Sequence, residues 1–384
     1  MARTFTQLLQ EDLVGKYVIV RIDANVEYTP DGIIDDLEGL RLDRALPTIK
    51  ELQHAEARII LVGHMGRDGE QSLQSVVEYF EKKHNLEMTY IENILEESAR
   101  ESVARMNNGE IVLFENIRKY AGETANDPEF AKYLASQANY YVNEAFSVAH
   151  RAHASVTGIP SIIPGYMGLN TEREYETVRD VYEHLDTSLI CVGGAKFKTK
   201  LDLIRHALHQ DAWVLVAGAL AHTFYKARGQ SIGESLWDDV DVSDIAQHPH
   251  VIVPTHVLVR EAGEDEVVIE KRIEDVGETD VIVDMGISSM EDVYEKLPGE
   301  AFTHILWNGP LGWYEKGYIE GTIVFGQWLS EQNSDTIIGG GDTVYVMQKY
   351  APDIIECYDF ISTGGGALLD LVTDGGLPGI DVLR

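Results

Sequence analysis

Cysteine and long apolar runs are scarce in this chain of 384 residues. Its two cysteines, Cys191 and Cys357, both lie in apolar, strand-like runs. Such positions predict small buried side chains rather than a disulfide or a redox role. No stretch approaches the ~18 consecutive apolar residues of a membrane-spanning helix. The first residues lead into a mixed, acidic segment instead of an apolar signal core, so we expect a cytoplasmic protein with no membrane partner.

Positive charge is also in short supply. The chain has 31 lysines and arginines against 64 aspartates and glutamates, a net charge of −33. This balance excludes general binding to nucleic acid or to an anionic membrane. The acidic residues are spread along the chain, which is typical of a solvated acidic surface; adaptation to a salty cytoplasm stays open as an alternative.

Two common glycine signatures are absent, namely the P-loop G-x-x-x-x-G-K-[ST] and the dinucleotide fingerprint G-x-G-x-x-G. The sequence therefore lacks the main signature expected of a hydride-transfer enzyme. Other glycine-rich runs occupy residues 193–196, 339–343 and 362–366, each between an apolar run and a helix-compatible segment. A strand, a glycine turn and a helix N-terminus present unpaired N–H groups to an anion. The sequence thus predicts that phosphates are bound at more than one point.

The order of expected strands and helices predicts an α/β fold. Most apolar runs are continuous, as in strands buried on both faces of a parallel sheet. Strands are expected at residues 17–22, 58–62, 111–114, 140–143, 189–192, 213–216, 251–253, 281–284, 304–307, 336–338 and 360–362. Helices between them include 129–138, 201–209 and 323–331, and Asp127-Pro128 is typical of a capped helix start.

We expect two doubly wound lobes, each a mostly parallel sheet flanked by helices. The predicted boundaries are 1–165 for an N-terminal lobe, 166–186 for a connecting hinge helix, 187–361 for a C-terminal lobe, and 362–384 for a segment that returns to the first lobe. Folds of this class bind ligands beyond the carboxyl ends of their strands.

Arginine and histidine gather behind the strand ends of the first half, together with two other polar residues. The arginines and the histidine are Arg21, Arg41, His64, Arg67, Arg118 and Arg151, and the other two are Asp23 and Asn25. Because arginine binds phosphate and carboxylate oxygens in a bidentate manner, this cluster predicts a small, multiply charged anion. His150 and His153 are three apart, but a zinc site needs three or four ligands and no others are in register.

The second half has the features of a nucleotide site. Lys196 and Lys200 are four residues apart, which predicts that they share one helix face behind the first glycine run. Asp342 lies inside the second glycine run, and magnesium is commonly held by one or two carboxylates together with phosphate oxygens.

These runs resemble one family, the phosphoglycerate kinases, along nearly the whole chain. The matching segments are residues 20–26, 41–49, 63–67 and 149–153 in the first half, and 193–196, 307–310, 339–343 and 362–367 in the second. Each segment alone is a weak signal, whereas all of them in this order are very specific.

The resemblance implies two Rossmann-like lobes, with 3-phosphoglycerate or 1,3-bisphosphoglycerate on the first and Mg²⁺ with ATP or ADP on the second. It implies phosphoryl transfer between them on hinge closure, near Gly168 and residues 362–366, in a protein expected to be a monomer. The implied substrate ligands are Asp23, Asn25, Arg41, His64, Arg67, Arg118 and Arg151. The implied nucleotide ligands are Gly194, Lys196, Lys200, Gly218, Asn308, Pro310, Glu315, Gly341, Asp342 and Thr343. The transferring group would be stabilised by Arg41, Lys196, Gly364 and Gly365, with Asp342 on the metal.

Several positions depart from the pattern of the family. Ser147-Val148 replaces a usual Gly-Thr, which removes a hydroxyl near the proposed hinge, and Ala217 and Ala219 replace glycines beside the adenine. The remaining departures are Asp68 for proline, Phe360 for histidine and Leu368 for serine. Neutral drift accounts for them, with altered hinge energetics or nucleotide choice as the alternative.

Two rival functions remain open. One is a kinase of another small carboxylate on the same scaffold, and the other is a catalytically silent metabolite-binding protein. The physiological direction of transfer does not follow from the sequence.

Overall fold

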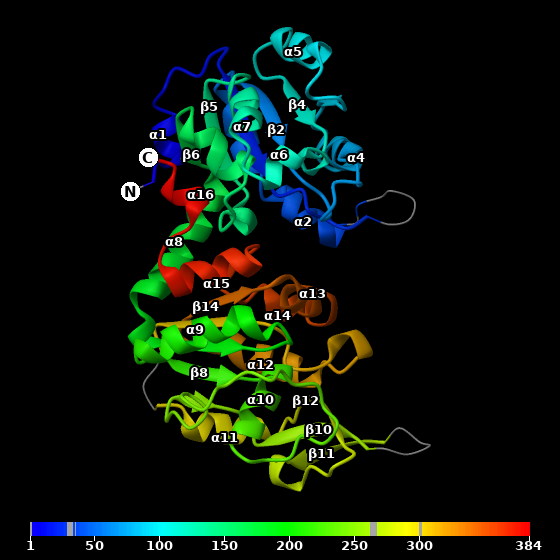
Figure 1. Ribbon diagram of the computed structural model, residues 1–384, viewed down its shortest axis with the longest axis vertical. Helices are drawn as coiled ribbons and strands as arrows, with labels where there is room; N and C mark the ends of the chain where they lie inside the picture. The colour runs from blue at the N-terminus through cyan, green and yellow to red at the C-terminus, as the bar shows by residue number, and fades with distance from the viewer. Residues whose placement is uncertain (1, 29–33, 35, 262–266, 299–301) are drawn as a thin grey trace. The chain divides into compact units, whose positions relative to one another are not determined.

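The protein is described here by a computed structural model that covers residues 2–28, 34, 36–261, 267–298 and 302–384 (Figure 1). The chain divides into two compact units. The first comprises Met1–Glu176 and Gly376–Arg384, and the second comprises Thr177–Gly375. This division differs from the predicted boundaries at the C-terminal end. Helix α15 (Gly365–Asp374) packs against α9 (Phe197–His209) inside the second unit, so the chain returns to the first unit at Gly376 rather than at residue 362.

The first unit contains a six-stranded sheet in which every pairing is parallel, with the order β3-β4-β2-β1-β5-β6. Its strands are β1 (Tyr17–Ile22), β2 (Arg58–Val62), β3 (Thr89–Ile91), β4 (Ile111–Phe114), β5 (Tyr140–Glu144) and β6 (Gly165–Met167). In the register, Val20 of β1 lies between Leu61 and Val142. The central strands are buried on both faces, as continuous apolar runs predict.

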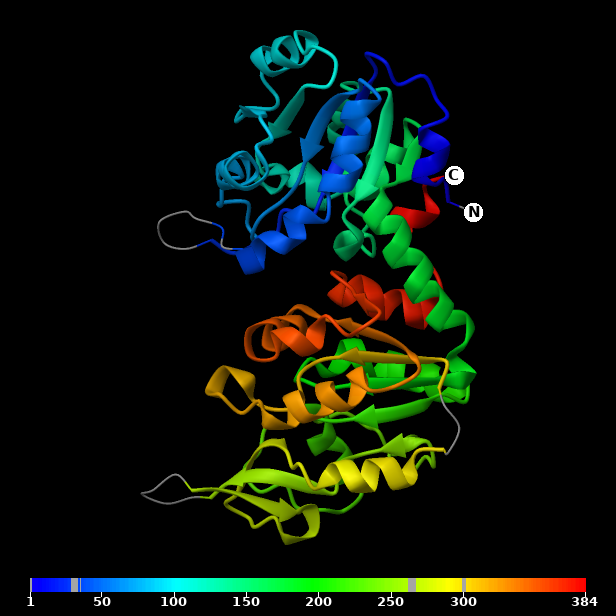
Figure 2. The ribbon, with the colours of Figure 1, turned by 180° about the vertical axis from the view of Figure 1, so that it is seen from behind.

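Helices cover both faces of this sheet. They are α1 (Phe5–Leu8), α2 (Asp36–Asp43), α3 (Leu46–His54), α4 (Gln74–His84), α5 (Glu97–Ala104), α6 (Ala121–Thr124), α7 (Pro128–Ala135) and α16 (Pro378–Asp381), with α8 (Leu169–Glu183) leading out of the unit. Figure 1 shows α6 and α7 in front of the sheet, and Figure 2, from behind, shows α3 over the other face. Ile49 and Leu52 of α3 pack with Val18 and Val20 in the core. The chain ends lie together, because the Arg3 amide donates to the Leu383 carbonyl at 2.7 Å.

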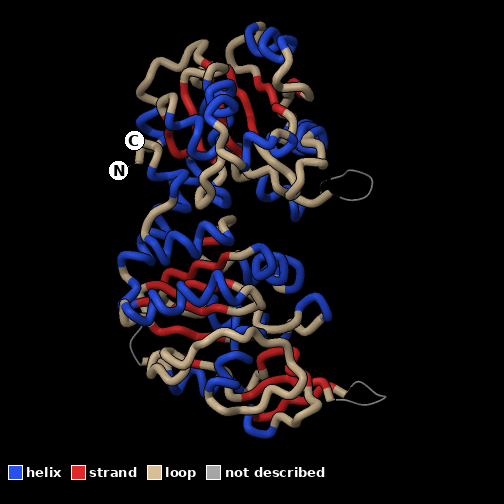
Figure 3. Tube along the Cα trace, in the orientation of Figure 1, coloured by secondary structure: helices blue, strands red, loops and turns tan. Residues whose placement is uncertain are grey.

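The second unit contains two sheets (Figure 3). The larger is parallel, with the order β15-β14-β13-β7-β8-β9, and the smaller is antiparallel, with the order β11-β10-β12. The strands are β7 (Ser188–Val192), β8 (Trp213–Val216), β9 (Val251–Ile252), β10 (His256–Arg260), β11 (Val268–Arg272), β12 (Val281–Met285), β13 (His304–Asn308), β14 (Asp335–Gly339) and β15 (Phe360–Ile361).

Its helices are α9 and α15, given above, with α10 (Ala219–Ala227), α11 (Ser289–Lys296), α12 (Glu320–Ser330), α13 (Gly341–Tyr350) and α14 (Pro352–Ile355). Helices α11 to α14 share one core cluster with Cys191, Trp307 and Ile338 of the larger sheet. Helix α9 packs on β7, β8 and α15. The larger sheet is therefore sandwiched between helices, as in the first unit.

The sequence predicted the parallel architecture of both units, and this is confirmed. Asp127 caps α7 as expected, because its side chain accepts from the Phe130 amide at 2.8 Å. The smaller sheet was not predicted: β10 and β11 were missed, and residues 281–284 lie in its strand β12 rather than in a parallel sheet.

The two cysteines differ in burial. Cys191 is buried as predicted, whereas the prediction for Cys357 is wrong, because Cys357 lies exposed in the turn before β15.

None of the helices in the described part of the chain combines the length and the apolar character needed to cross a membrane.

Candidate active site

The predicted anion-binding residues of the first unit follow four neighbouring strands, β4, β2, β1 and β5. Because the strands are parallel, their carboxyl ends lie at one edge of the sheet. The side chains at this edge also bind one another. Asn25, beyond β1, accepts from the Gly66 amide at 3.0 Å, and Arg118 donates to the Gly66 carbonyl at 2.6 Å. The structure thus brings together the loops that follow three different strands.

Arg21 is a buried cation beneath this edge, at 1 % exposure. Its Nε atom donates to the Ser155 hydroxyl at 3.0 Å, and the same hydroxyl donates to the Glu123 carboxylate at 2.7 Å. A second guanidinium nitrogen contacts His64. Arg21 is therefore committed to the protein interior, where it positions His64 and does not reach out to a ligand.

The pKa values in this cluster show how strongly positive it is. The pKa of Arg118 lies below its usual value because of burial first and then because of repulsion from Arg151 and Arg21. Burial and the same arginines also lower the pKa of His64. Groups that lose affinity for protons in this way are stabilised when an anion binds among them. The cluster is therefore electrostatically suited to a multiply charged anion.

Asp23 is a carboxylate at this edge, and three groups among the described residues donate hydrogen bonds to it. The Ser147 hydroxyl donates to it at 2.7 Å, the Asn25 amide at 3.2 Å and Arg41 Nη1 at 3.5 Å. Although Val148 lacks the hydroxyl that the family usually has there, the preceding residue supplies one to Asp23. Val148 itself is buried in a small apolar cluster, which explains why a hydrocarbon side chain is tolerated.

In the second unit, the loops after β7 and β13 touch at backbone distance. The Gly193 amide donates to the Asn308 carbonyl at 3.0 Å, and the Gly194 amide to the Pro310 carbonyl at 2.8 Å. A Cβ atom on Gly309 would lie 2.3 Å from the Gly193 oxygen, and Gly309 has φ +106°. Only glycine fits there. The close contact between these loops therefore fixes the floor of the site.

The two lysines do not share a helix face as predicted. Lys196 precedes α9 with non-helical backbone angles and is largely exposed, with Nζ 3.9 Å from Asp342. Lys200 lies inside α9 and is buried. Its Nζ donates to the carbonyls of Gly193 and Asn308, the latter at 3.1 Å. The prediction failed because the chain enters α9 only at Phe197, one residue too late for Lys196 to take part in the helix.

Helix α13 begins at the second glycine run, at Gly341, and carries the predicted polar residues. Asp342 is half exposed and accepts from the Tyr314 hydroxyl at 3.0 Å. Thr343 is fully buried and accepts from the Gly309 amide at 2.7 Å. The amide nitrogen Nδ2 of Asn308 is buried and has no partner among the described residues. A buried donor of this kind costs free energy unless a ligand or water satisfies it.

The third glycine run differs in its hydrogen bonding. The Gly364 amide donates to the Ser362 hydroxyl at 3.1 Å, and Gly365 opens α15 with open space around it. In this conformation the Gly364 amide is engaged within its own turn.

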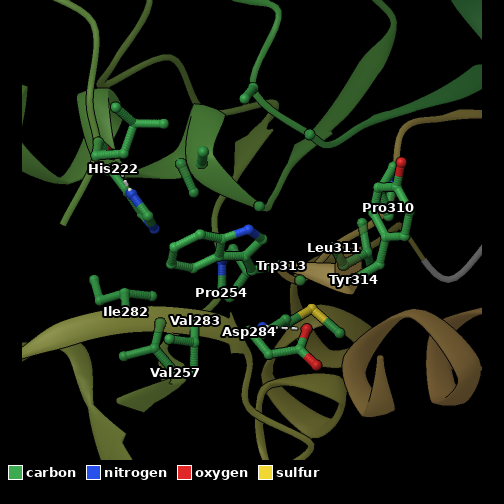
Figure 4. Close-up of a pocket in the computed structure, with 18 of the residues that line it drawn as sticks. His222, Pro254, Val257, Ile282, Val283, Asp284, Pro310, Leu311, Trp313 and Tyr314 are labelled. Carbon is green, nitrogen blue, oxygen red and sulfur yellow. Dashed lines mark hydrogen bonds between the residues drawn. The ribbon is translucent and has the colours of Figure 1, made fainter. Parts of the chain in front are cut away.

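A cavity of about 360 Å³ lies in the second unit beside the first two runs (Figure 4). At one end are Gly194, Lys196, Pro310, Glu315 and Asp342. At the other end the walls are largely apolar, from Leu236, Pro254, Val257, Ile282 and Val283. A polar end joined to an apolar end suits a ligand with a charged tail and a flat apolar body.

The two alanines that replace glycines play different parts here. Ala219 lines the cavity, whereas Ala217 belongs to the core with Trp307. The expectation that both methyl groups flank a nucleotide base therefore applies to Ala219 alone.

Three comparisons bear on the identity of this chain. The sequence profile of the family described as "Phosphoglycerate kinase" matches residues 8–374. A phosphoglycerate kinase of Dictyoglomus turgidum is 36% identical, over 100% of this chain and 99% of its own. The chain belongs to the phosphoglycerate kinase family. Phosphoglycerate kinases of Coxiella burnetii and Pyrococcus horikoshii have similar solved structures, with TM-scores of 0.83 and 0.84 at 30% and 26% identity. Each covers 100% of this chain, and the match spans 99% and 98% of the respective structures.

Within this phosphotransferase family, the resemblance inferred from the motifs is confirmed, while the roles of individual residues stay predictions. Sequence reasoning missed the aromatic and imidazole side chains of the cavity, which are His222, Tyr225, Trp313 and Tyr314. Trp313 and Tyr314 are aromatic residues shortly after a glycine-proline turn, a signal that was available. His222 lies within a helix whose pattern resembles ordinary core, so nothing in the sequence set it apart.

Apart from the predicted Asp342, the described residues contain one group of three side chains that could hold a metal ion. His150 and His153 are not part of a metal-binding group among the described residues. The group of three comprises Asp180 of α8 with His304 and Asp335, which open β13 and β14 at the edge opposite the glycine runs.

Proposed function

We propose that the chain catalyses reversible phosphoryl transfer between 1,3-bisphosphoglycerate and ADP, which gives 3-phosphoglycerate and ATP. The observation that supports the proposal is that a member of this family gathers arginines and His64 at the strand ends of one parallel sheet. At the strand ends of the other parallel sheet it has glycine-rich loops beside a cavity. In the first unit, Arg118, Arg151 and His64 would hold the phosphoglycerate, together with Asp23, Asn25 and Arg67. In the second, the cavity beside Gly194 and Asp342 would hold the nucleotide.

For this reaction the protein has mainly to position the two reactants and to stabilise the charge of the transferring group. The acceptor carboxylate of 3-phosphoglycerate is already ionised at neutral pH, so no general base is required. Charge builds on the transferring phosphoryl oxygens, and cations close to it lower the barrier. Arg41 and Lys196 are exposed enough to move to that group, since their side chains are 31% and 82% exposed. Transfer requires the two ligands to meet, so the proposal includes the predicted hinge closure.

The residues of the second site fit Mg²⁺. Asp342 offers a carboxylate at the opening of α13, half exposed and next to Lys196. One carboxylate plus phosphate oxygens is a common magnesium environment. When bound with the nucleotide, Mg²⁺ would neutralise part of the phosphate charge. The unpartnered Asn308 Nδ2 supports a ligand at the adjoining loop. Monomeric state and cytoplasmic location stay predictions.

The experiment is product trapping. Purified protein is incubated with ATP, MgCl₂ and 3-phosphoglycerate, and hydroxylamine converts any acyl phosphate to a hydroxamate. We expect hydroxamate with 3-phosphoglycerate, and none with glycerate or acetate in parallel incubations. Hydroxamate from another carboxylate alone would support the rival kinase, and none from any acceptor would contradict the proposal.

A further inference from the structure

The imidazole of His222 lies in the apolar half of the cavity. His222 belongs to α10, the helix that follows Gly218, and it is 5% exposed. Figure 4 shows its ring pointing from α10 toward the indole of Trp313. The chemistry proposed above assigns no role to this group.

Its hydrogen bond decides which ring nitrogen carries the proton. Nδ1 lies 2.6 Å from the carbonyl oxygen of Leu236. A carbonyl only accepts, so the proton is on Nδ1. Burial lowers the pKa of His222, and the bond to the Leu236 carbonyl offsets only part of that effect. The ring is therefore neutral near pH 7, and Nε2 presents an unshared electron pair.

Nε2 is available to a ligand. None of the residues described in the structure donates to this atom, and His222 lines the cavity. The hydroxyl of Tyr225, also at the cavity wall, is already committed to the Pro254 carbonyl at 2.8 Å. His222 thus offers an acceptor among the apolar side chains of Leu236, Val257 and Ile282.

We propose that His222 Nε2 accepts a hydrogen bond from the exocyclic 6-amino group of adenine, and that this selects adenine nucleotides over 6-oxopurine nucleotides. The proposal rests on the proposed function, because it takes the cavity to be the nucleotide site. With phosphates beside Lys196 and Asp342, the base extends toward the apolar end where His222 lies.

The discrimination follows from the fixed tautomer. A 6-oxo group is an acceptor, and two acceptors that face each other repel. The ring could donate from Nε2 and keep the hydrogen bond from Nδ1 to the Leu236 carbonyl only as an imidazolium. Burial disfavours that charged form. A site that leaves a buried polar group unpaired rejects the mismatched ligand strongly.

The test is calorimetric binding of three diphosphates to the wild-type chain with MgCl₂. They are ADP, IDP, which carries a 6-oxo group, and purine riboside diphosphate, which has only hydrogen at position 6. We expect affinity to fall in that series as ADP, purine riboside diphosphate, IDP, with about tenfold or more between the ends. This series needs no variant and so does not depend on a mutant folding.

His222→Phe keeps a flat aromatic ring but removes the acceptor, and we expect it to bring ADP and IDP to similar affinities. Val257→Ala, at the same wall, should change all three affinities alike. Equal wild-type affinities, or a ratio that survives His222→Phe, would overturn this inference and leave the proposed function standing. No binding of any of the three would overturn both.

Discussion

The Nη2 atom of Arg21 lies 2.8 Å from Nδ1 of His64. A guanidinium has no acceptor, so Nδ1 must accept, and the proton of His64 is on Nε2. Because Arg21 is itself buried and bound to Ser155, it fixes both the tautomer and the direction of the ring. His64 is therefore a neutral hydrogen-bond donor.

The first prediction concerns that donor. Burial and three arginines lower the pKa of His64, so its protonation does not change between pH 5 and pH 8. We expect His64→Phe to raise KM for 3-phosphoglycerate about tenfold, with kcat much less affected, and His64→Gln, which can donate, to recover part of the loss. Steady-state kinetics across this pH range check both points. A change in KM for 3-phosphoglycerate near pH 6.5 that is absent in His64→Gln would contradict this prediction, because it would show that the His64 ring titrates there.

The second prediction concerns Arg41. Its guanidinium reaches Asp23 only at 3.5 Å, so the ground-state contact is weak and the side chain is free to shift to the transferring group. We expect Arg41→Met to lower kcat about a thousandfold with a small change in KM. Arg105→Met is the matched control, because Arg105 is an exposed arginine paired with Glu101 on α5. Loss of binding without loss of kcat would make Arg41 a substrate ligand only.

The third prediction concerns Lys200 and stability. Burial lowers its pKa to about 7 from a usual 10.5. The unfolded chain then binds more protons than the folded chain between those values, so stability rises with pH across that window. We expect the second unit to gain about 2 kcal/mol between about pH 7 and about pH 9, and Lys200→Met to lack this gain.

Tryptophan fluorescence is a convenient measurement, because all five tryptophans lie in the second unit. Urea unfolding is followed at the two pH values for both proteins. The same pH slope in wild type and in Lys200→Met would assign the effect to other groups.

The fourth prediction concerns acid sensitivity of the first unit. Burial, and then Arg151, lower the pKa of His150 to about 4, and the pKa of His153 falls to about 4 for the same two reasons. Because the unfolded state binds protons first, stability is lost as pH falls from 6.5 toward 4. We expect the protection factors of amides in first-unit peptides, that is, the intrinsic exchange rate divided by the observed rate, to fall between pH 7 and pH 5, and to fall less in His150→Gln. An equal loss of protection in peptides of both units would argue against a local cause.

The parallel sheets were predictable because their strands are buried on both faces and so form unbroken apolar runs. Strand β10 is different: its residues alternate between buried and half-exposed, from His256 to Arg260, and β11 is exposed or half-exposed throughout. A small sheet of this kind gives only a short alternating pattern, which is too weak to predict a strand. Helix entry at Phe197 rather than Lys196 likewise depends on tertiary contacts that sequence periodicity does not record.

The residue types of the candidate site were predictable from strand-turn-helix spacing, but their directions were not. From the sequence, both lysines are expected on one helix face. In the structure, Lys200 is buried and donates to backbone carbonyls, whereas Lys196 is exposed. Similarly, the sequence shows that Val148 lacks the hydroxyl usual in the family, but it does not show that the Ser147 hydroxyl donates to Asp23. Orientation depends on burial, which arises only when distant segments pack together.

The most direct test of the account is steady-state ATP consumption with 3-phosphoglycerate and MgCl₂, coupled to reduction of the acyl phosphate formed. Lys196→Ala is measured beside the wild type, because Lys196 is exposed and its loss should leave the fold intact. The account predicts turnover that depends on 3-phosphoglycerate and falls about a hundredfold or more in Lys196→Ala. A folded wild-type protein without turnover, or equal turnover in the two proteins, would contradict it.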